Sequence, residues 1–447
     1  MTTTTKIRII GGGLAGCEAA WQALQLGCDV ILHEMRPVKM TGAHTSGKLA
    51  ELVCSNSLKS TLEVSAPGQL KLEMSQLDSL IIRAATAAKV PAGNALAVDR
   101  EVFSQYIESA LLNHPKFKRV DGEVTHLPSD KELASANEYL IICSGPLTSP
   151  ALAQEIDRIT GNKKRLYFYD AIAPVISADS IDMEVCYLAD RYGEGEGDYI
   201  NVPLDKEQYN QFIDGVEAAE KVPLHEFEDV NYFESCLPIE VMIQRGRETL
   251  RFGPMKPVGL DNPRTGRRPW GVIQLRQENI EKTMYSMVGF QTKMKWPEQK
   301  RLFSTLPGLQ NLEILRYGSI HRNTYINGPE LLAEDLSLKD SPRIFLAGQI
   351  TGVEGYTESA AIGLLAGRFA ALKSVGKTAP ALPAQCLLGA LWVYVTKGNL
   401  GKYAPMNANL GLLAPVEVDR KASKSDRKSL QIKRANEVFS DYLNALH

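Results

Sequence analysis

A short apolar run that ends in a glycine-rich turn limits the possible folds of this chain more than any other feature. Ile7, Ile9 and Ile10 are typical of a strand buried inside a parallel sheet. The run leads into GGGLAG, which fits the pattern G-x-G-x-x-G and comprises Gly11, Gly12, Gly13, Leu14, Ala15 and Gly16. A helix is expected from Leu14 to Leu26, with Gly27 placed to end it.

The glycines and a following acid have separate tasks in a dinucleotide-binding unit. Gly11 permits the tight turn, Gly13 lets the backbone approach a pyrophosphate, and Gly16 allows the helix to pack closely on the strand. The free N–H groups at the helix N-terminus then face the phosphates. A second strand, Val30 to Leu32, ends near Glu34, roughly 20 residues beyond the glycines, where a carboxylate accepts hydrogen bonds from a ribose 2′-hydroxyl.

Length and composition exclude several classes of protein. The 447 residues are enough for about two or three domains, and 44% hydrophobic with 23% charged residues is ordinary for a soluble globular protein. The net charge of -2 gives no general attraction to nucleic acid, so any polyanion must be met by a local basic patch. There is no signal peptide or apolar span, so we expect a cytoplasmic protein without membrane contact. The seven cysteines form no C-x-x-C pair, which argues against a metal site and a dithiol reductase.

The residue composition and the hydrophobic pattern of the sequence change twice along the chain. From about Asn162, aromatic residues, prolines and short alternating runs predict an antiparallel-rich insertion. The α/β texture returns with a strand from Arg343 to Gly348 and a helix from about Thr357 to Leu372. We therefore predict a Rossmann-like FAD-binding domain of α/β class in two parts, 1–160 and 316–447, with a smaller inserted α+β domain over 161–315. Two glycine-ended strands so far apart suit FAD better than NAD.

Other segments give weaker expectations. Apolar residues between Gly68 and Lys89 have helical spacing, and Asp99 is a plausible N-cap for a further helix. Basic residues near Trp270 and Trp296 are typical of solvated loops, but they could also hold phosphates and stack bases. The chain from Val416 predicts a basic linker and a terminal amphipathic helix, a second candidate for RNA contact.

Two cysteines have unusual surroundings. Cys54 lies in LVCSNS, among polar residues and in a long loop that follows the nucleotide-binding unit. Cys236 lies in ESCLPIE, flanked by Glu234, Pro238 and Glu240. A lone cysteine is usually a small buried hydrophobe, so the residues alone indicate a flavoprotein with two candidate reactive thiols.

Five motifs together resemble the folate-dependent tRNA (uracil-5-)-methyltransferases, the TrmFO or Gid family. They are GGGLAGCEAAWQ with HEMRP, ELVCSNSLKS, FESCLPIE, GSIHRNTYIN and LAGQITGVEGYTESAA, and they occur in the family order over essentially the whole chain. Val202 departs from the pattern, because many relatives are expected to carry a cysteine there. A thiol at that position is then not required for the chemistry.

The resemblance implies an FAD-dependent transfer of a methylene from 5,10-methylenetetrahydrofolate to C5 of the T-loop uridine in the T-arm of tRNA, with NAD(P)H as reductant. It assigns to Cys236 the addition to uracil C6 that activates C5, and to Cys54 the removal of the C5 proton. It further implies that Gly348 and Tyr356 contact the cofactor, with Tyr356 on the isoalloxazine. The residues implied to lie beside the folate are His321, Arg322 and Asn323.

Three alternatives remain at this point. The same chemistry on a ribosomal RNA uridine uses the same motifs. A small-molecule NAD(P)H-flavin oxidoreductase predicts a second glycine-rich nucleotide motif or a redox cysteine pair, and the sequence has neither. A non-catalytic flavin-bearing RNA-binding partner would resemble the related GidA proteins, which are typically longer and have a helical C-terminal domain for their partner. The choice of NADH or NADPH and the oligomeric state, a monomer among the options, are left open.

Overall fold

The computed structural model describes residues 5–161, 166–191, 197–223, 237–398, 403–416 and 423–446. The strands of its main sheet, in spatial order, are β16 (Ser337–Leu338), β17 (Ser341–Leu346), β7 (Glu138–Ile142), β1 (Lys6–Ile10), β2 (Asp29–Glu34) and β6 (Phe117–Asp121). The sheet is parallel except at one edge, where β16 runs antiparallel to β17. Every residue of β7 is buried, as expected for a strand in the interior of a parallel sheet.

The register of this sheet brings the carboxyl ends of four strands to one edge. Ile10 at the end of β1 pairs with His33 of β2 and with Ile142 of β7, and Ile142 pairs in turn with Leu346 of β17. The segments that follow these strands therefore meet at the same place, although Gly11 and Ala347 lie far apart in the sequence. In open parallel sheets this edge is where ligands bind.

Two long helices pack against each other on this sheet with very little space between them. A Cβ at Gly363 of α12 (Tyr356–Ser374) would lie 2.2 Å from the carbonyl oxygen of Ala15 in α1 (Leu14–Gln25). One turn further on, a Cβ at Gly367 would lie 2.4 Å from the carbonyl oxygen of Ala19. Only glycine allows so close an approach of two helix backbones. The first and last parts of the chain are thus fixed together.

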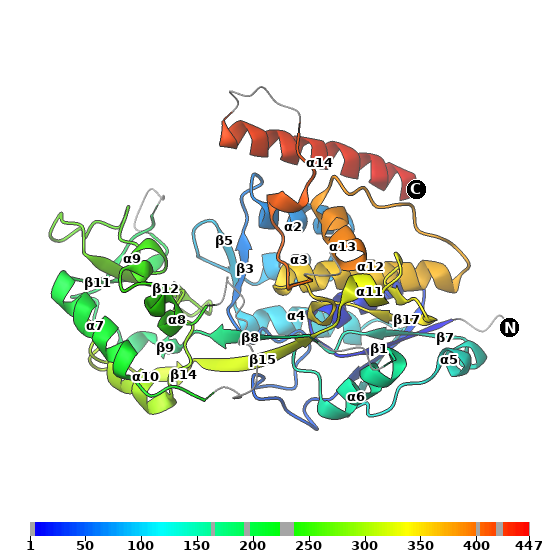
Figure 1. Cartoon of the computed structure of the whole chain (residues 1–447), viewed down its shortest axis with the longest axis horizontal. Helices are drawn as coiled ribbons and strands as arrows, with labels where there is room; N and C mark the ends of the chain where they lie inside the picture. Colours follow the sequence, from blue (N-terminus) through cyan, green and yellow to red (C-terminus); the bar gives the residue numbers. More distant parts are fainter. Residues whose placement is uncertain are drawn as a thin grey trace.

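The remaining helices of this domain surround the sheet, and α14 lies across the top of the molecule in Figure 1. Asp99 caps α4 as predicted, because its side chain accepts from the N–H groups of Glu101 and Val102. The stretch from Gly68 to Lys89, in contrast, contains two helices instead of one. The first ends before Asp78, whose backbone is left-handed with φ 58°, and Ser79 is the N-cap of the second. These helices are α2 (Ala66–Gln76), α3 (Leu80–Ala87), α4 (Arg100–Leu112), α5 (Asp130–Ala136), α6 (Pro150–Ile159), α11 (Gly328–Leu331), α13 (Leu387–Lys397) and α14 (Lys424–Leu446). None of the helices in the described ranges is long and apolar enough to cross a membrane.

The middle of the chain forms an antiparallel sheet with its own apolar core. Its strands, in spatial order, are β10 (Tyr187–Leu188), β11 (Tyr199–Leu204), β12 (Gly271–Gln277), β13 (Met284–Met287), β9 (Val175–Ser177) and β14 (Ile314–Arg316). Its helices are α7 (Lys206–Ala218), α8 (Ile239–Gln244), α9 (Thr249–Phe252) and α10 (Trp296–Phe303). It occupies one end of the molecule, the left in Figure 1, and the ribbon of β8 (Leu166–Ile172) and β15 (Ser319–Tyr325) runs from it toward the main sheet. The predicted fold class is confirmed.

Candidate functional site

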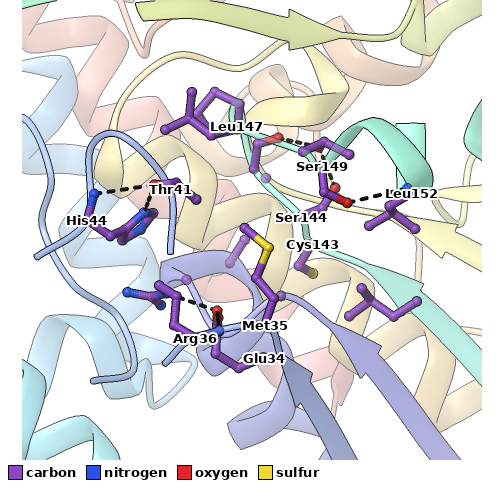
Figure 2. Close-up of a pocket in the computed structure, with 18 of the residues that line it drawn as sticks. Glu34, Met35, Arg36, Thr41, His44, Cys143, Ser144, Leu147, Ser149 and Leu152 are labelled. Atoms are coloured by element: carbon purple, nitrogen blue, oxygen red, sulfur yellow. Dashed lines mark hydrogen bonds and ion pairs between the residues drawn. The ribbon is translucent and has the colours of Figure 1, made fainter. Parts of the chain in front are cut away.

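A cleft lies at the edge of the main sheet where the carboxyl ends of the strands meet. It encloses about 1040 Å³ of space, part of it open to solvent, and we call it the dinucleotide cleft. Figure 2 shows Glu34 and Arg36 at the end of β2, Thr41 and His44 on the following loop, and the segment after β7 on the opposite side. The cleft brings together seven residues predicted to bind the cofactor, namely Gly11, Gly13, Leu14, Ala15, Glu34, Gly348 and Tyr356.

The glycines of the first turn differ in what surrounds them. A Cβ at Gly13 would meet no atom within 4 Å, and α1 has no side-chain cap at its N-terminus. A Cβ at Gly16 would lie only 1.9 Å from the carbonyl oxygen of Gly11, and one at Gly12 would lie 2.8 Å from Glu34 Oε2. Gly11 has φ 103°, which a residue with a side chain rarely adopts. Gly13 therefore leaves the helix N-terminus open to the cleft, while Gly11, Gly12 and Gly16 shape the turn.

Glu34 is held by three donors from the protein. Its Oε2 accepts from the N–H of Gly12 at 2.8 Å, and its Oε1 accepts from the Arg36 N–H at 3.0 Å and from Arg36 Nε at 2.9 Å. Burial by itself raises the pKa of the Glu34 carboxyl, but the hydrogen bonds and charge of Arg36 outweigh it and hold the pKa below its ordinary value. Arg36 also donates to Glu51 Oε2 at 3.1 Å. Glu34 is therefore an ionised acid, and Oε2 has capacity for one further donor.

A second cavity, with about 1070 Å³ of partly open space, adjoins the dinucleotide cleft, and we call it the thiol cavity. Cys54 and Asn323 line it, as do Lys59 and Arg276. The residues common to the linings of both cavities are Val53, Pro146, Leu147, Gln349 and Tyr356. A predicted catalytic thiol and the predicted cofactor residues thus lie on either side of one shared wall.

Cys54 differs from the other cysteines in the described ranges, because it alone is not buried. Burial raises the pKa of the thiols at Cys17, Cys28, Cys143 and Cys386, and raises the pKa of Cys186 to about 12. Such thiols are poor nucleophiles and bases at neutral pH. Cys143 lines the dinucleotide cleft but belongs to this inert group.

The backbone of Cys54 is held from three sides. Its N–H donates to the Tyr356 hydroxyl at 2.6 Å, and its carbonyl oxygen accepts from Arg100 at 3.0 Å and from Arg316 at 2.9 Å. Arg100 also donates to Glu278 at 2.7 Å. Burial by itself raises the pKa of the Glu278 carboxyl, but the charges of Arg100 and Arg276 outweigh it and keep the pKa below its ordinary value.

A cationic side chain on the wall of the thiol cavity is fixed by a buried acid. Lys59 Nζ lies 2.8 Å from Oε1 of Glu358, which also accepts from the N–H of Ala408 at 2.9 Å. Lys59 has φ 64°, a left-handed conformation that is uncommon for a residue with a side chain. Lys71 lies behind this pair, donates to the Leu58 carbonyl at 2.8 Å, and has a pKa lowered to about 8 by burial.

The structure describes the other predicted site residues in different detail. Asn323 is buried and lines the thiol cavity. His321 and Arg322 belong to β15, where their backbones pair with Asp170 and Tyr169 of β8. Cys236 lies outside the described residues.

The two predicted base-stacking tryptophans lie in unlike surroundings. Trp270 is half-buried, and the Arg251 guanidinium lies 3.6 Å from its ring centroid. Trp296 is 60% exposed and stacks on Tyr317 with the ring centroids 5.3 Å apart. Tyr317 directly follows Arg316, so of the two tryptophans only Trp296 offers an exposed ring beside a segment that reaches Cys54.

Several residues of the site were missed by sequence reasoning. Arg100, Glu278 and Arg316 are single charged residues without a local pattern, and only the tertiary fold brings them to the Cys54 carbonyl. Lys59 and Gln349 stand inside two of the quoted motifs, ELVCSNSLKS and LAGQITGVEGYTESAA. For these two, the motif position was a usable signal.

A family model and several known proteins are similar to this chain over most of its length. The family model described as Glucose inhibited division protein A matches residues 6–378. A methylenetetrahydrofolate–tRNA-(uracil-5-)-methyltransferase TrmFO from Geobacter sulfurreducens is 52% identical over 433 residues, which cover 97% of either chain. The protein of the same name from Staphylococcus epidermidis is 50% identical over 444 residues, which cover 99% of this chain and 100% of that one.

A solved structure supports the fold. Aquifex aeolicus GidA, in its form I crystal, has a TM-score of 0.70 at 16% identity and covers 98% of this chain and 76% of its own. The family model and the TrmFO relatives, which match most or nearly all of this chain, lead to the same assignment. The chain belongs to the GidA family and, within it, to the TrmFO family of methylenetetrahydrofolate–tRNA-(uracil-5-)-methyltransferases.

Proposed function

We propose that this chain is an FAD-dependent enzyme that methylates C5 of the T-loop uridine of tRNA, with 5,10-methylenetetrahydrofolate as carbon donor and NAD(P)H as reductant. The observation that carries the proposal is the shared wall between the dinucleotide cleft and the thiol cavity, with Cys54 on one side and the glycine turn on the other. The names of the TrmFO relatives supply the substrate and the carbon donor. A cytoplasmic location remains a prediction from the sequence.

The residues of the dinucleotide cleft fit FAD. The open space at Gly13 and the uncapped N-terminus of α1 leave room and N–H donors for a pyrophosphate. Glu34 is ionised and suits a ribose hydroxyl. Gly348 and Tyr356 line the same cleft, and we assign to them the contact with the flavin ring. When bound, FAD supplies the reducing equivalents that turn a transferred methylene into a methyl group.

The protein residues have to make uracil C5 reactive and then remove its proton. C5 is a poor nucleophile until a thiolate adds at C6, and we assign that addition to Cys236 on the resemblance of its motif. Cys54 is the half-buried thiol beside the cofactor residues, and we assign to it the removal of the C5 proton. Asn323, with His321 and Arg322 on the same strand, is proposed to hold the folate.

An RNA that carries 5-fluorouridine at the target position tests this division of labour. Because fluorine cannot leave as a proton does, the enzyme should form a covalent adduct visible as a shifted band on a denaturing gel. Cys236→Ala should abolish both the adduct and methyl transfer, whereas Cys54→Ala should stop turnover and leave the adduct intact. Both variants should retain flavin reduction by NAD(P)H. A shifted band from Cys236→Ala with none from Cys54→Ala would reverse the assignment.

The identity of the RNA needs a separate experiment. Nucleoside mass spectrometry of tRNA and ribosomal RNA from cells that lack this protein should show loss of 5-methyluridine from tRNA alone. Loss from ribosomal RNA with intact tRNA would replace the proposed substrate while leaving the chemistry unchanged.

A further inference from the structure

The loop that carries Cys54 contacts both the nucleotide-binding part of the chain and the antiparallel sheet. Asn56 is completely buried, and its amide donates to the carbonyl of Val98 at 3.0 Å and to the carbonyl of Gln277 in β12 at 2.9 Å. Arg276, also in β12, donates to Asn56 Oδ1 at 2.9 Å. The antiparallel sheet thus holds the chain two residues beyond Cys54, although Cys54 itself follows from the nucleotide-binding unit.

Cys54 is held more directly by the three contacts described above, which we call the Cys54 clamp and define as Arg100, Arg316 and Tyr356. The three residues come from the start of α4, the end of β14 and the start of α12. Both arginines also reach the preceding backbone, since Arg100 donates to the Leu52 carbonyl and Arg316 donates to the Val53 carbonyl at 3.4 Å. These contacts fix both ends of the Cys54 peptide, and so fix the direction in which its side chain leaves the backbone.

Two guanidinium groups, those of Arg100 and Arg316, donate to the one carbonyl oxygen of Cys54, which is unusual for a loop residue. Burial and the neighbouring Arg100 lower the pKa of Arg316, so its charge is held there against an electrostatic cost. Arg100 has the Glu278 carboxylate as its own ion-pair partner. Of the two arginines of the clamp, Arg316 is therefore the one whose replacement leaves the ion pair between Arg100 and Glu278 in place.

We propose that Arg316 is a positioning residue, which acts through the Cys54 carbonyl to hold the Cys54 thiol toward the shared wall of the two cavities. This inference rests on the proposed role of Cys54 in removing the C5 proton. Proton transfer from carbon depends steeply on the distance and direction of the base, and a displacement of about 1 Å costs about a hundredfold in rate. Arg316 lines neither the dinucleotide cleft nor the thiol cavity, so binding of cofactor and substrate should not depend on it.

The test compares Arg316→Gln and Arg316→Lys with a control arginine that also donates to a backbone carbonyl. Arg343 is the control, because it donates to the Glu138 carbonyl at 3.2 Å and lines neither cavity. Arg316→Gln should lower kcat for methyl transfer about a hundredfold, with the KM values for tRNA and folate and the rate of flavin reduction unchanged. Arg316→Lys should recover part of the loss, because an ammonium can still donate to the carbonyl. Arg343→Gln should behave as wild type.

Hydrogen exchange measured by mass spectrometry follows the clamp independently of activity. In Arg316→Gln, the peptide that contains residues 52–56 should exchange at least about tenfold faster than in the wild type. If Cys54→Ala retains full activity, the proposed role of Cys54 is wrong, while the exchange result still decides whether Arg316 holds the loop. Arg316→Gln with kcat within about twofold of wild type, or with KM and flavin reduction impaired in proportion, overturns the positioning role. If Arg316→Gln does not fold, Arg316→Lys is subject to the same criteria.

Discussion

Gly13 and Gly16 stand three residues apart in the same turn, yet they should fail in different ways when replaced. Gly13 has extended backbone, with φ -75° and ψ -171°, and open space where a side chain would go. Gly13→Val should therefore fold, with a cost of about 1 kcal/mol for the loss of glycine at the helix N-cap. The added methyl groups occupy the space of the pyrophosphate. Loss of about two charge-assisted hydrogen bonds then weakens FAD binding by at least about 3 kcal/mol, roughly a hundredfold in Kd.

Gly16→Ala is the matched comparison. Its Cβ would lie 1.9 Å from the carbonyl oxygen of Gly11, so strand and helix must separate, at a cost of about 3 kcal/mol or more in unfolding free energy. The assays are denaturant unfolding of the flavin-free proteins and titration of FAD by fluorescence quenching. Gly13→Val should lose affinity with little loss of stability, whereas Gly16→Ala should lose both. If Gly13→Val purifies with full flavin and an unchanged spectrum, the pyrophosphate is not bound at this turn.

Three further predictions follow from burial and charge. Lys71 has a pKa lowered to about 8, against about 10.4 in the unfolded chain, so the unfolded state binds more protons between these values. Unfolding free energy relative to Lys71→Met should therefore rise by about 3 kcal/mol between pH 7 and pH 10.5, and a flat difference would show that Lys71 is well solvated. Iodoacetamide at pH 7 should modify Cys54 before Cys17, Cys143 or Cys386, as peptide mass spectrometry can check, and equal rates would contradict the burial of those three thiols. Affinity for tRNA should fall with salt, with a slope of log K against log salt near -3 for about four phosphate contacts, and a flat response would favour a small-molecule oxidoreductase.

Features that depend on neighbouring residues were predictable from the sequence. The strand and helix of the glycine turn, the cap at Asp99 and the terminal helix α14 arise from apolar periodicity and local hydrogen bonding. The grouping in one cleft of the residues that we propose to bind the cofactor could also be predicted, because parallel strands present their carboxyl ends at one edge. Because these residues follow the ends of predicted parallel strands in the sequence, their location at this edge of the sheet could be expected.

Features that depend on distant contacts were not predictable in this way. The break between α2 and α3 depends on Ser79, which caps α3 while its hydroxyl donates to the buried Glu18 at 2.7 Å. Apolar spacing continues through that break, so periodicity gives no sign of it. The clamp residues Arg100 and Arg316 are more than 200 residues apart in the sequence, and the tertiary fold brings both to the Cys54 carbonyl. No local pattern in the sequence distinguishes them from surface arginines.

The α12 helix contacts structural elements of both the dinucleotide cleft and the thiol cavity. At its first turn the Tyr356 hydroxyl accepts the N–H of Cys54, and two turns later Gly363 lies against the backbone of Ala15 in α1. The close approach at Gly363 and the hydrogen bond from Cys54 to Tyr356 connect the N-terminus of α1 to the Cys54 backbone through closely packed atoms. We therefore expect a pyrophosphate bound at the N-terminus of α1 to restrain Cys54 as well, so that cofactor binding and the alignment of the thiol are coupled through this packing.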